Sequence, residues 1–111
     1  MLPAKQAGEY DMLVELCRKS ILSLGELKQF KINGLEIIAV NLEGNVYCLD
    51  GRCTHAGAPL AEGTLDGKVL TCPWHYSQFN ITNGEVLRGP AQKPLRAYRV
   101  EEKENIVFID L

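Results

Sequence analysis

Short runs of alternating or crowded apolar residues follow one another along the chain, separated by polar segments. Gln29–Ile32 alternates polar and apolar residues, Asn33–Gly34 is a dipeptide favoured in type I′ hairpin turns, and Leu35–Leu42 is richly apolar. We therefore predict a β-hairpin over residues 29–42. The other strand-like runs are Met12–Arg18, Val46–Leu49, Thr64–Leu65, Lys68–Thr71, Phe79–Thr82, Glu85–Leu87, Leu95–Val100 and Ile106–Ile109.

Turn-forming residues separate these runs, and no segment has the apolar periodicity of a convincing amphipathic helix. Short strands joined by glycine-containing turns are typical of an all-β sandwich or a small barrel. We expect the last two strands to form a hairpin around a charged tip, Glu101–Asn105. The other predicted turns are Glu43–Asn45, Asp66–Gly67 and Asn83–Gly84.

The chain has the length and composition of one globular domain. Its 111 residues suffice for a single core but not for two. Apolar residues make up 46% and charged residues 23%, which is ordinary for a soluble protein. The first residues have little apolar content and include Pro3 and Gly8, so we expect a loosely ordered tail over residues 1–11 and one domain over residues 12–111.

Charge and hydropathy exclude several classes of partner. A net charge of -2 provides no basic footprint for nucleic acid. The longest uninterrupted aliphatic run, Ile37–Val40, is far too short to span a bilayer. The first ten residues lack the basic and apolar blocks of a secretion signal, and no twin arginine is present. We expect a cytoplasmic protein that binds neither nucleic acid nor membranes.

Both histidines of the chain lie close to a cysteine. Cys53 and His55 are separated by one residue, and Cys72 and His75 by two. Thiolate and imidazole groups are ligands for zinc and for the iron ions of iron–sulfur clusters. If folding brings the two loops together, four ligands meet at one point. We expect residues 50–82 or so, which are rich in turn-forming residues, to form a small metal-holding lobe.

Two other interpretations of these four residues are open. In the first interpretation, the histidines are ordinary loop residues and the cysteines are buried as small apolar side chains. The repeated order of Cys then His at ligand spacing argues against this interpretation. A structural zinc ion also suits a Cys2His2 set, although zinc ligands usually have two to four residues between them and only Thr54 separates Cys53 from His55. A domain of this size can also form a core without metal.

The other two cysteines, Cys17 and Cys48, lie within apolar strand-like runs. A free thiol in such a run packs as a small apolar side chain. We therefore expect both residues in the core, and neither as a ligand.

The stretch Cys53–Leu60, together with Gly63, Val69–His75 and Phe79, resembles the Rieske [2Fe-2S] ferredoxins. These are the soluble electron carriers of bacterial ring-hydroxylating dioxygenase systems, with archaeal Rieske-type relatives. The resemblance extends from about Met12 to the C-terminus. It implies an antiparallel β-sandwich with an inserted two-loop lobe that binds the cluster.

The resemblance also implies the ligand set. Cys53 and Cys72 would hold the inner iron, and His55 and His75 the outer iron, of one [2Fe-2S] cluster per chain. Each iron then has two sulfides and two protein ligands, so no coordination position stays open for a substrate. One-electron transfer is the chemistry left to such a site, and we expect an electron carrier and not an enzyme.

The implied partners are a reductase and a terminal oxygenase or other oxidoreductase, with the carrier itself a monomer. No small-molecule substrate is expected. A small Rieske subunit bound stably to a larger oxidoreductase, such as a nitrite reductase, is an alternative, and a zinc-stabilised interaction module is another. By analogy with the family, Ala56, Pro59, Tyr76 and Pro90 would surround the histidines and offer a modest apolar docking patch.

Departures from the high-potential members of the family bear on the redox potential. Those members link their two loops by a disulfide, where this chain has Ala58 and Trp74, and they place a tyrosine hydroxyl near a ligand sulfur, where it has Phe79. Ser77, however, matches a serine that donates to a bridging sulfide. Within the Rieske range of roughly -150 to +300 mV we expect a midpoint below about 0 mV.

Overall fold

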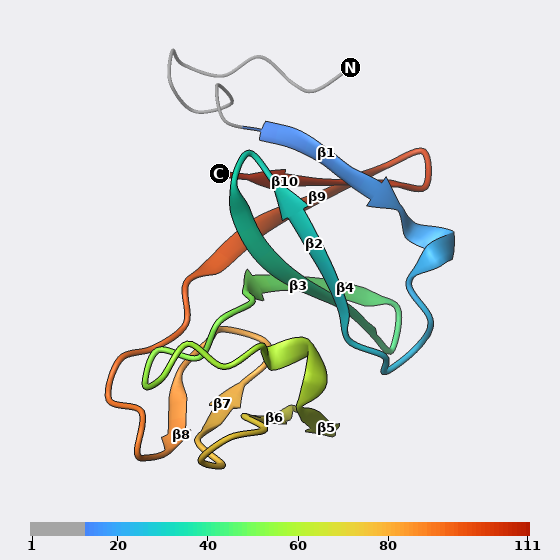
Figure 1. The fold of residues 1–111 in the computed structure, drawn as a ribbon. Helices are drawn as coiled ribbons and strands as arrows, with labels where there is room; N and C mark the ends of the chain where they lie inside the picture. The colour runs from blue at the N-terminus through green and yellow to red at the C-terminus, as the bar shows by residue number, and fades with distance from the viewer. Residues whose placement is uncertain (1–12) are drawn as a thin grey trace.

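The computed structural model describes residues 13–111, so Met12 and the predicted tail, residues 1–11, lie outside the described part (Figure 1). That part has two single-turn 3₁₀ helices, η1 (Lys19–Ile21) and η2 (Leu60–Glu62), and no α-helix. Neither helix of residues 13–111 has the length and apolar content needed to cross a membrane. The strands are β1 (Leu13–Arg18), β2 (Lys28–Ile32), β3 (Leu35–Leu42), β4 (Asn45–Asp50), β5 (Thr64–Asp66), β6 (Val69–Thr71), β7 (Gln78–Asn80), β8 (Val86–Arg88), β9 (Ala97–Lys103) and β10 (Ile106–Asp110).

The strands form two antiparallel sheets. The six-stranded sheet, called the base here, has the order β1-β10-β9-β4-β3-β2. The four-stranded sheet has the order β5-β6-β7-β8 and, with its loops, is called the lobe. Figure 1 shows the lobe at one end of the molecule, next to β3 and β4, with β1 and β10 at the other end. The prediction of an all-β antiparallel fold is confirmed.

Strands β3 and β4 lie between two hydrophobic cores, which explains why β3 is apolar along most of its length. Successive side chains of a strand point to opposite faces of the sheet. Ile38, Val40 and Leu49 pack in the core shared with the lobe, whereas Ile37 and Ala39 pack in the core of the base. Burial on both faces of these strands fastens the lobe to the base through apolar packing.

Cys17 and Cys48 are buried in the core of the base, as predicted. Burial raises the pKa of both thiols, and it raises that of Cys48 to about 12. Both thiols are therefore neutral near pH 7 and pack as small apolar groups. Cys53 and Cys72 belong to the other core, the one shared with the lobe.

Three two-residue turns of the base place both central residues at positive φ, as a type I′ turn requires. They are Asn33–Gly34, which confirms the predicted hairpin, Glu43–Gly44 and Glu104–Asn105. The predicted extent of the charged tip, Glu101–Asn105, is wrong. Lys103 still pairs with Ile106, because two residues in the left-handed region are enough to reverse the chain.

Asn83–Gly84 does not form the tight hairpin turn that its sequence suggests. Strand β7 ends at Asn80, before the predicted end at Thr82, and the side-chain Oδ1 of Asn80 accepts hydrogen bonds from both the backbone N–H and the hydroxyl of Thr82. The N–H of Gly84 then donates to the Asn80 carbonyl at 2.7 Å. The side chain of Asn80 thus competes with the strand and draws the following residues into a turn.

Two smaller boundaries also differ from prediction. Asp66 pairs with Val69, so the turn between β5 and β6 consists of Gly67 and Lys68. Leu95 lies outside β9, because its N–H donates to the Gly84 carbonyl and not to a neighbouring strand.

Candidate metal centre

The first ligand loop, residues 51–59, leads from β4 to η2 and is closed by its own backbone. The Cys53 N–H donates to the Ala58 carbonyl at 2.9 Å, and the Gly57 N–H donates to the Cys53 carbonyl at 2.8 Å. Gly57 has a φ of +73°, a left-handed conformation that favours glycine. The tight closure buries Cys53 and leaves His55 exposed at the tip.

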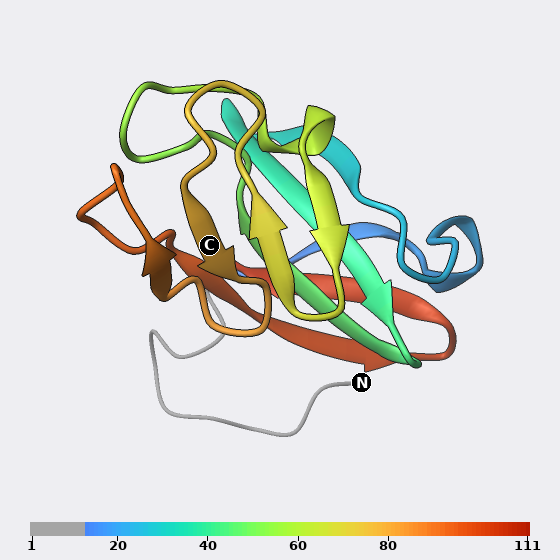
Figure 2. The same cartoon turned by 90° about the horizontal axis from the view of Figure 1, so that it is seen from below.

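The second ligand loop, residues 72–77, joins β6 to β7 and repeats this arrangement. The Cys72 N–H donates to the Ser77 carbonyl at 2.8 Å, and Tyr76 adopts a φ of +63° where the chain turns back. Cys72 is buried and His75 is exposed. Figure 2 shows this loop and the first ligand loop at the same end of the lobe, opposite the turn between β5 and β6.

Folding brings the four predicted residues together as two pairs. Cys53 and Cys72 are only 4% and 1% exposed, and the Cys53 thiol lies close enough to Cys72 to raise the pKa of that thiol. The imidazole rings of His55 and His75 lie edge to face, with centroids 5.1 Å apart. No three His, Cys, Asp or Glu side chains of residues 13–111 form a group suited to one metal ion. The side chains form a buried sulfur pair and an exposed nitrogen pair.

The surroundings of Cys72 fit a metal-bound thiolate. Burial raises the pKa of its thiol, and the neighbouring Cys53 thiol raises it further. The backbone N–H groups of Trp74 and His75 donate to the sulfur and act in the opposite direction. Donors of this kind stabilise a thiolate ligand, and a bound cation replaces the thiol proton altogether. The chemistry of the donor set therefore fits an iron–sulfur cluster.

A third loop, residues 89–95, supports both ligand loops, a role that its sequence does not predict. The Thr54 hydroxyl donates to the Lys93 carbonyl at 2.6 Å, and the Ala91 N–H donates to the Ser77 hydroxyl oxygen at 2.9 Å. The prolines of this segment indicated only an interruption between strands. Nothing in its own residue pattern points to the ligand loops.

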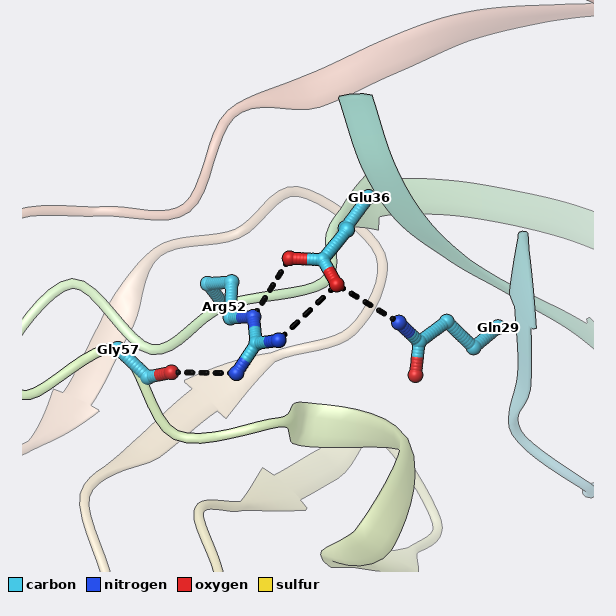
Figure 3. A network of polar contacts seen from close by, with 4 residues as sticks. All are labelled: Gln29, Glu36, Arg52 and Gly57. Carbon is cyan, nitrogen blue, oxygen red and sulfur yellow. Dashed lines mark hydrogen bonds and ion pairs between the residues drawn. The ribbon is translucent and has the colours of Figure 1, made fainter. Parts of the chain in front are cut away.

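A second support was also missed. The guanidinium of Arg52 binds Glu36 of β3 with two nitrogens, at 2.6 and 3.0 Å, and a further nitrogen donates to the Gly57 carbonyl at 3.0 Å (Figure 3). Gln29 of β2 donates to the same carboxylate at 3.3 Å. The Arg52 hydrogen bond is the main reason that the pKa of Glu36 lies below its ordinary value. Arg52 thus connects the first ligand loop to two strands of the base.

The four positions that bear on redox potential are placed as follows. Ala58 is fully buried, whereas Trp74 is 53% exposed. Phe79 is fully buried in the core shared with the lobe, and its ring carries no hydroxyl. Ser77 is also buried, and its hydroxyl oxygen already accepts the bond from Ala91.

Known proteins resemble this chain in sequence and in fold. It is 35% identical over 87 residues to the ferredoxin component of naphthalene 1,2-dioxygenase/salicylate 5-hydroxylase systems of a Ralstonia species, covering 78% of this chain and 84% of that one. The ferredoxin of carbazole 1,9a-dioxygenase from Nocardioides aromaticivorans superposes with a TM-score of 0.84 at 25% identity, over 90% of this chain and 98% of that one.

A further solved structure is a complex of reduced oxygenase and oxidized ferredoxin in carbazole 1,9a-dioxygenase. One chain of that complex matches with a TM-score of 0.82 at 30% identity, over 89% of this chain and 93% of its own length. The family described as the Rieske [2Fe-2S] domain matches residues 12–99, which include both ligand loops. The resemblance seen in the sequence is confirmed, and the chain belongs to the Rieske [2Fe-2S] domain family.

Proposed function

We propose that this chain carries single electrons from a reductase to a terminal oxygenase, with one Rieske [2Fe-2S] cluster per chain. Cys53 and Cys72 would hold the inner iron, and His55 and His75 the outer iron. The observation that supports this assignment best is the separation of the donors into a buried thiol pair and an exposed imidazole pair. Two irons with two protein ligands each need the four donors arranged in two pairs.

The cluster, when bound, supplies one-electron redox chemistry, and the chain supplies its position and surroundings. The lobe core excludes water from the sulfur side, where Leu60, Leu70 and Phe79 are fully buried. The loops expose both imidazoles, so the partner approaches on the nitrogen side. The names of the relatives describe ferredoxin components of dioxygenase systems, and one solved structure joins such a ferredoxin to its oxygenase. These relatives support the same role here.

We also propose that the chain acts as a cytoplasmic monomer, with its domain over residues 12–111 and its metal-holding lobe over about residues 50–82. The exposed residues around the histidines support short-lived docking. Tyr76 is 65% exposed, so most of its surface is open to a partner. A small apolar patch suits a carrier that must leave its partner again.

Elemental analysis and site-directed variants test the proposal. The purified protein should contain iron and acid-labile sulfide in the ratio of one cluster per chain, and the reduced form should give the EPR signal of a [2Fe-2S] centre. His75→Ala should remove the visible absorption. Cys17→Ala is the matched control, because it deletes a buried thiol outside the site and should leave the absorption unchanged. Zinc in place of iron and sulfide would refute the assignment.

A further inference from the structure

The side of the lobe next to His55 is bordered by basic residues. Between Glu85 and Glu101 the chain contains Arg88, Lys93, Arg96 and Arg99, and no acidic residue. The two ligand loops contribute no Asp, Glu, Lys or Arg beyond Arg52. Arg88, Lys93 and Arg96 are all exposed.

Strand register places Arg88 at the same end of the lobe as the histidines. Arg88 pairs with Gln78, the first residue of β7, which directly follows the second ligand loop. Asp66 and Glu85 of the lobe lie at its other end, whereas Glu62 of η2 lies close enough to Arg52 of the first ligand loop to raise the pKa of that guanidinium. Asp66 pairs with Val69 next to the turn, and Glu85 accepts a hydrogen bond from the last residue of β7.

Lys93 is adjacent to His55. The two residues line a surface depression of about 510 Å³ together with Thr54, Pro90 and Gln92. The carbonyl of Lys93 accepts the Thr54 hydroxyl, which fixes its backbone against the first ligand loop. Within residues 13–111 the ammonium group of Lys93 forms no ion pair.

Nearby acidic groups offset the other cations but not Arg88 and Lys93. Glu36 binds Arg52. The Arg96 guanidinium lies 4.4 Å from the centre of the Tyr98 ring, and the Tyr98 hydroxyl binds Asp50.

Much of the remaining negative charge is distant from the histidines. Glu101, Glu102 and Glu104 belong to the hairpin of β9 and β10, whose turn lies at the end of the base far from the ligand loops (Figure 1). The net charge of -2 therefore conceals a positive surface beside the exposed imidazoles.

The geometry points to a docking site for an acidic surface of the redox partner, in which the depression beside His55 receives a carboxylate that pairs with Lys93. Arg88 extends the positive surface, and the exposed rings of Trp74 and Tyr76 give the apolar contact. Charge complementarity identifies this occupant, because such pairing steers the encounter and fixes orientation more than it adds affinity. The inference rests on the proposed function and names the partner surface that this function needs.

The test uses the holoprotein and two oxidants of opposite charge, because a small ion reports the charge close to the site of electron exit. Hexacyanoferrate(III), a trianion, takes one electron and becomes hexacyanoferrate(II). Tris(phenanthroline)cobalt(III), a trication, takes one electron and becomes the cobalt(II) complex. Rates are measured by stopped-flow absorbance from about 0.01 M to about 0.1 M ionic strength, over which the Debye length falls from about 30 to about 10 Å.

We expect the anionic oxidant to slow as salt is added and the cationic oxidant to be unaffected or to accelerate. Lys93→Gln should lower the low-salt rate of the anionic oxidant several-fold. Lys68→Gln is the matched control, since it removes the same charge from the turn at the opposite end of the lobe. Inert hexacyanocobaltate(III) should bind to the wild-type protein in a calorimetric titration and bind more weakly to Lys93→Gln.

A faster, salt-sensitive reaction with the cationic oxidant, as the net charge alone predicts, would overturn the inference. Equal effects of Lys93→Gln and Lys68→Gln would overturn it as well. Iron and sulfide analysis of the same samples separates this result from a failure of the proposed function. A protein with its cluster intact but without the anion preference refutes only the docking site, whereas a protein without a cluster refutes both.

Discussion

Arg52 and Glu36 form a two-pronged ion pair that joins the first ligand loop to the start of β3. Arg52 lies next to Cys53 in sequence, and its third contact, to the Gly57 carbonyl, crosses the loop that presents His55. A rigid planar fork of this kind fixes orientation as well as distance. The ion pair is therefore placed to hold the first ligand loop against the base.

Arg52→Gln should accelerate cluster loss while changing global stability little. The substitution frees the first ligand loop, but exposed ion pairs contribute little to unfolding free energy. Bleaching of the visible absorption by an iron chelator should be several-fold faster, with the thermal midpoint close to that of the wild type. Arg52→Lys, which keeps the charge and loses the fork, should fall between the two.

The matched control for this experiment is Glu102→Gln. It breaks the 2.8 Å ion pair with Lys19 at the far end of the base. Bleaching at the wild-type rate is expected. Equal acceleration in the two variants would show that the effect of Arg52 is not specific to the loop.

Stability should decline in alkali through Tyr98. Burial, and then the hydrogen bond to Asp50, raise the pKa of Tyr98 to about 12. The unfolded chain loses this proton near pH 10, so the unfolded state binds fewer protons between about pH 10 and about pH 12. The contribution of this residue is complete below about pH 10 and is lost as pH rises through about 12.

Tyr98→Phe should remove that pH dependence and cost about 1 to 2 kcal/mol near neutral pH, because Asp50 loses its hydrogen-bond donor. Urea unfolding at about pH 8 and about pH 11 measures both effects. A Tyr98→Phe protein that keeps the wild-type loss of stability in alkali would assign the effect to another group.

Gly84 should tolerate no side chain, for a reason beyond its backbone angle. A Cβ at this position would lie 2.1 Å from the Leu95 carbonyl oxygen, whereas a Cβ at Gly34 would meet nothing within 4 Å. Both residues have φ near +80°, so Gly34→Ala is a matched control that carries only the left-handed strain of about 1 to 2 kcal/mol. Gly84→Ala should be clearly less stable than Gly34→Ala in denaturant unfolding, and equal losses would contradict the clash.

The midpoint potential should lie below about 0 mV, in the lower part of the Rieske range. The ring of Phe79 is fully buried and has no hydroxyl to donate to a ligand sulfur. Trp74 is exposed while Ala58 is buried, and neither carries a sulfur that would link the loops. A redox titration followed by EPR measures the midpoint, and a clearly positive value would count against this interpretation of the three residues.

Patterns confined to one strand or one loop were readable from sequence. Alternation located β2, and the Asn33–Gly34 dipeptide located its hairpin, because both signals depend on neighbouring residues alone. The order of Cys then His at ligand spacing identified the four candidate ligands for the same reason. Chemistry restricts which residue types bind metal, and the chain has only two histidines.

Contacts between distant segments were not readable in this way. Glu36 and Arg52 look like ordinary surface charges until the first ligand loop is laid against β3. The link from Ser77 to Ala91 likewise depends on the path of the third loop, which its prolines do not reveal. Asn80 ends β7 through its own side chain, where the apolar pattern alone favoured a longer strand.

Both imidazoles lie at a single edge of the molecule, while the sulfurs are sealed behind them. Donor and acceptor proteins must therefore bind the same surface, and the first partner has to dissociate before the second can bind. Exchange of the two partners then limits turnover. An excess of either partner should slow electron transfer because it keeps the other from binding.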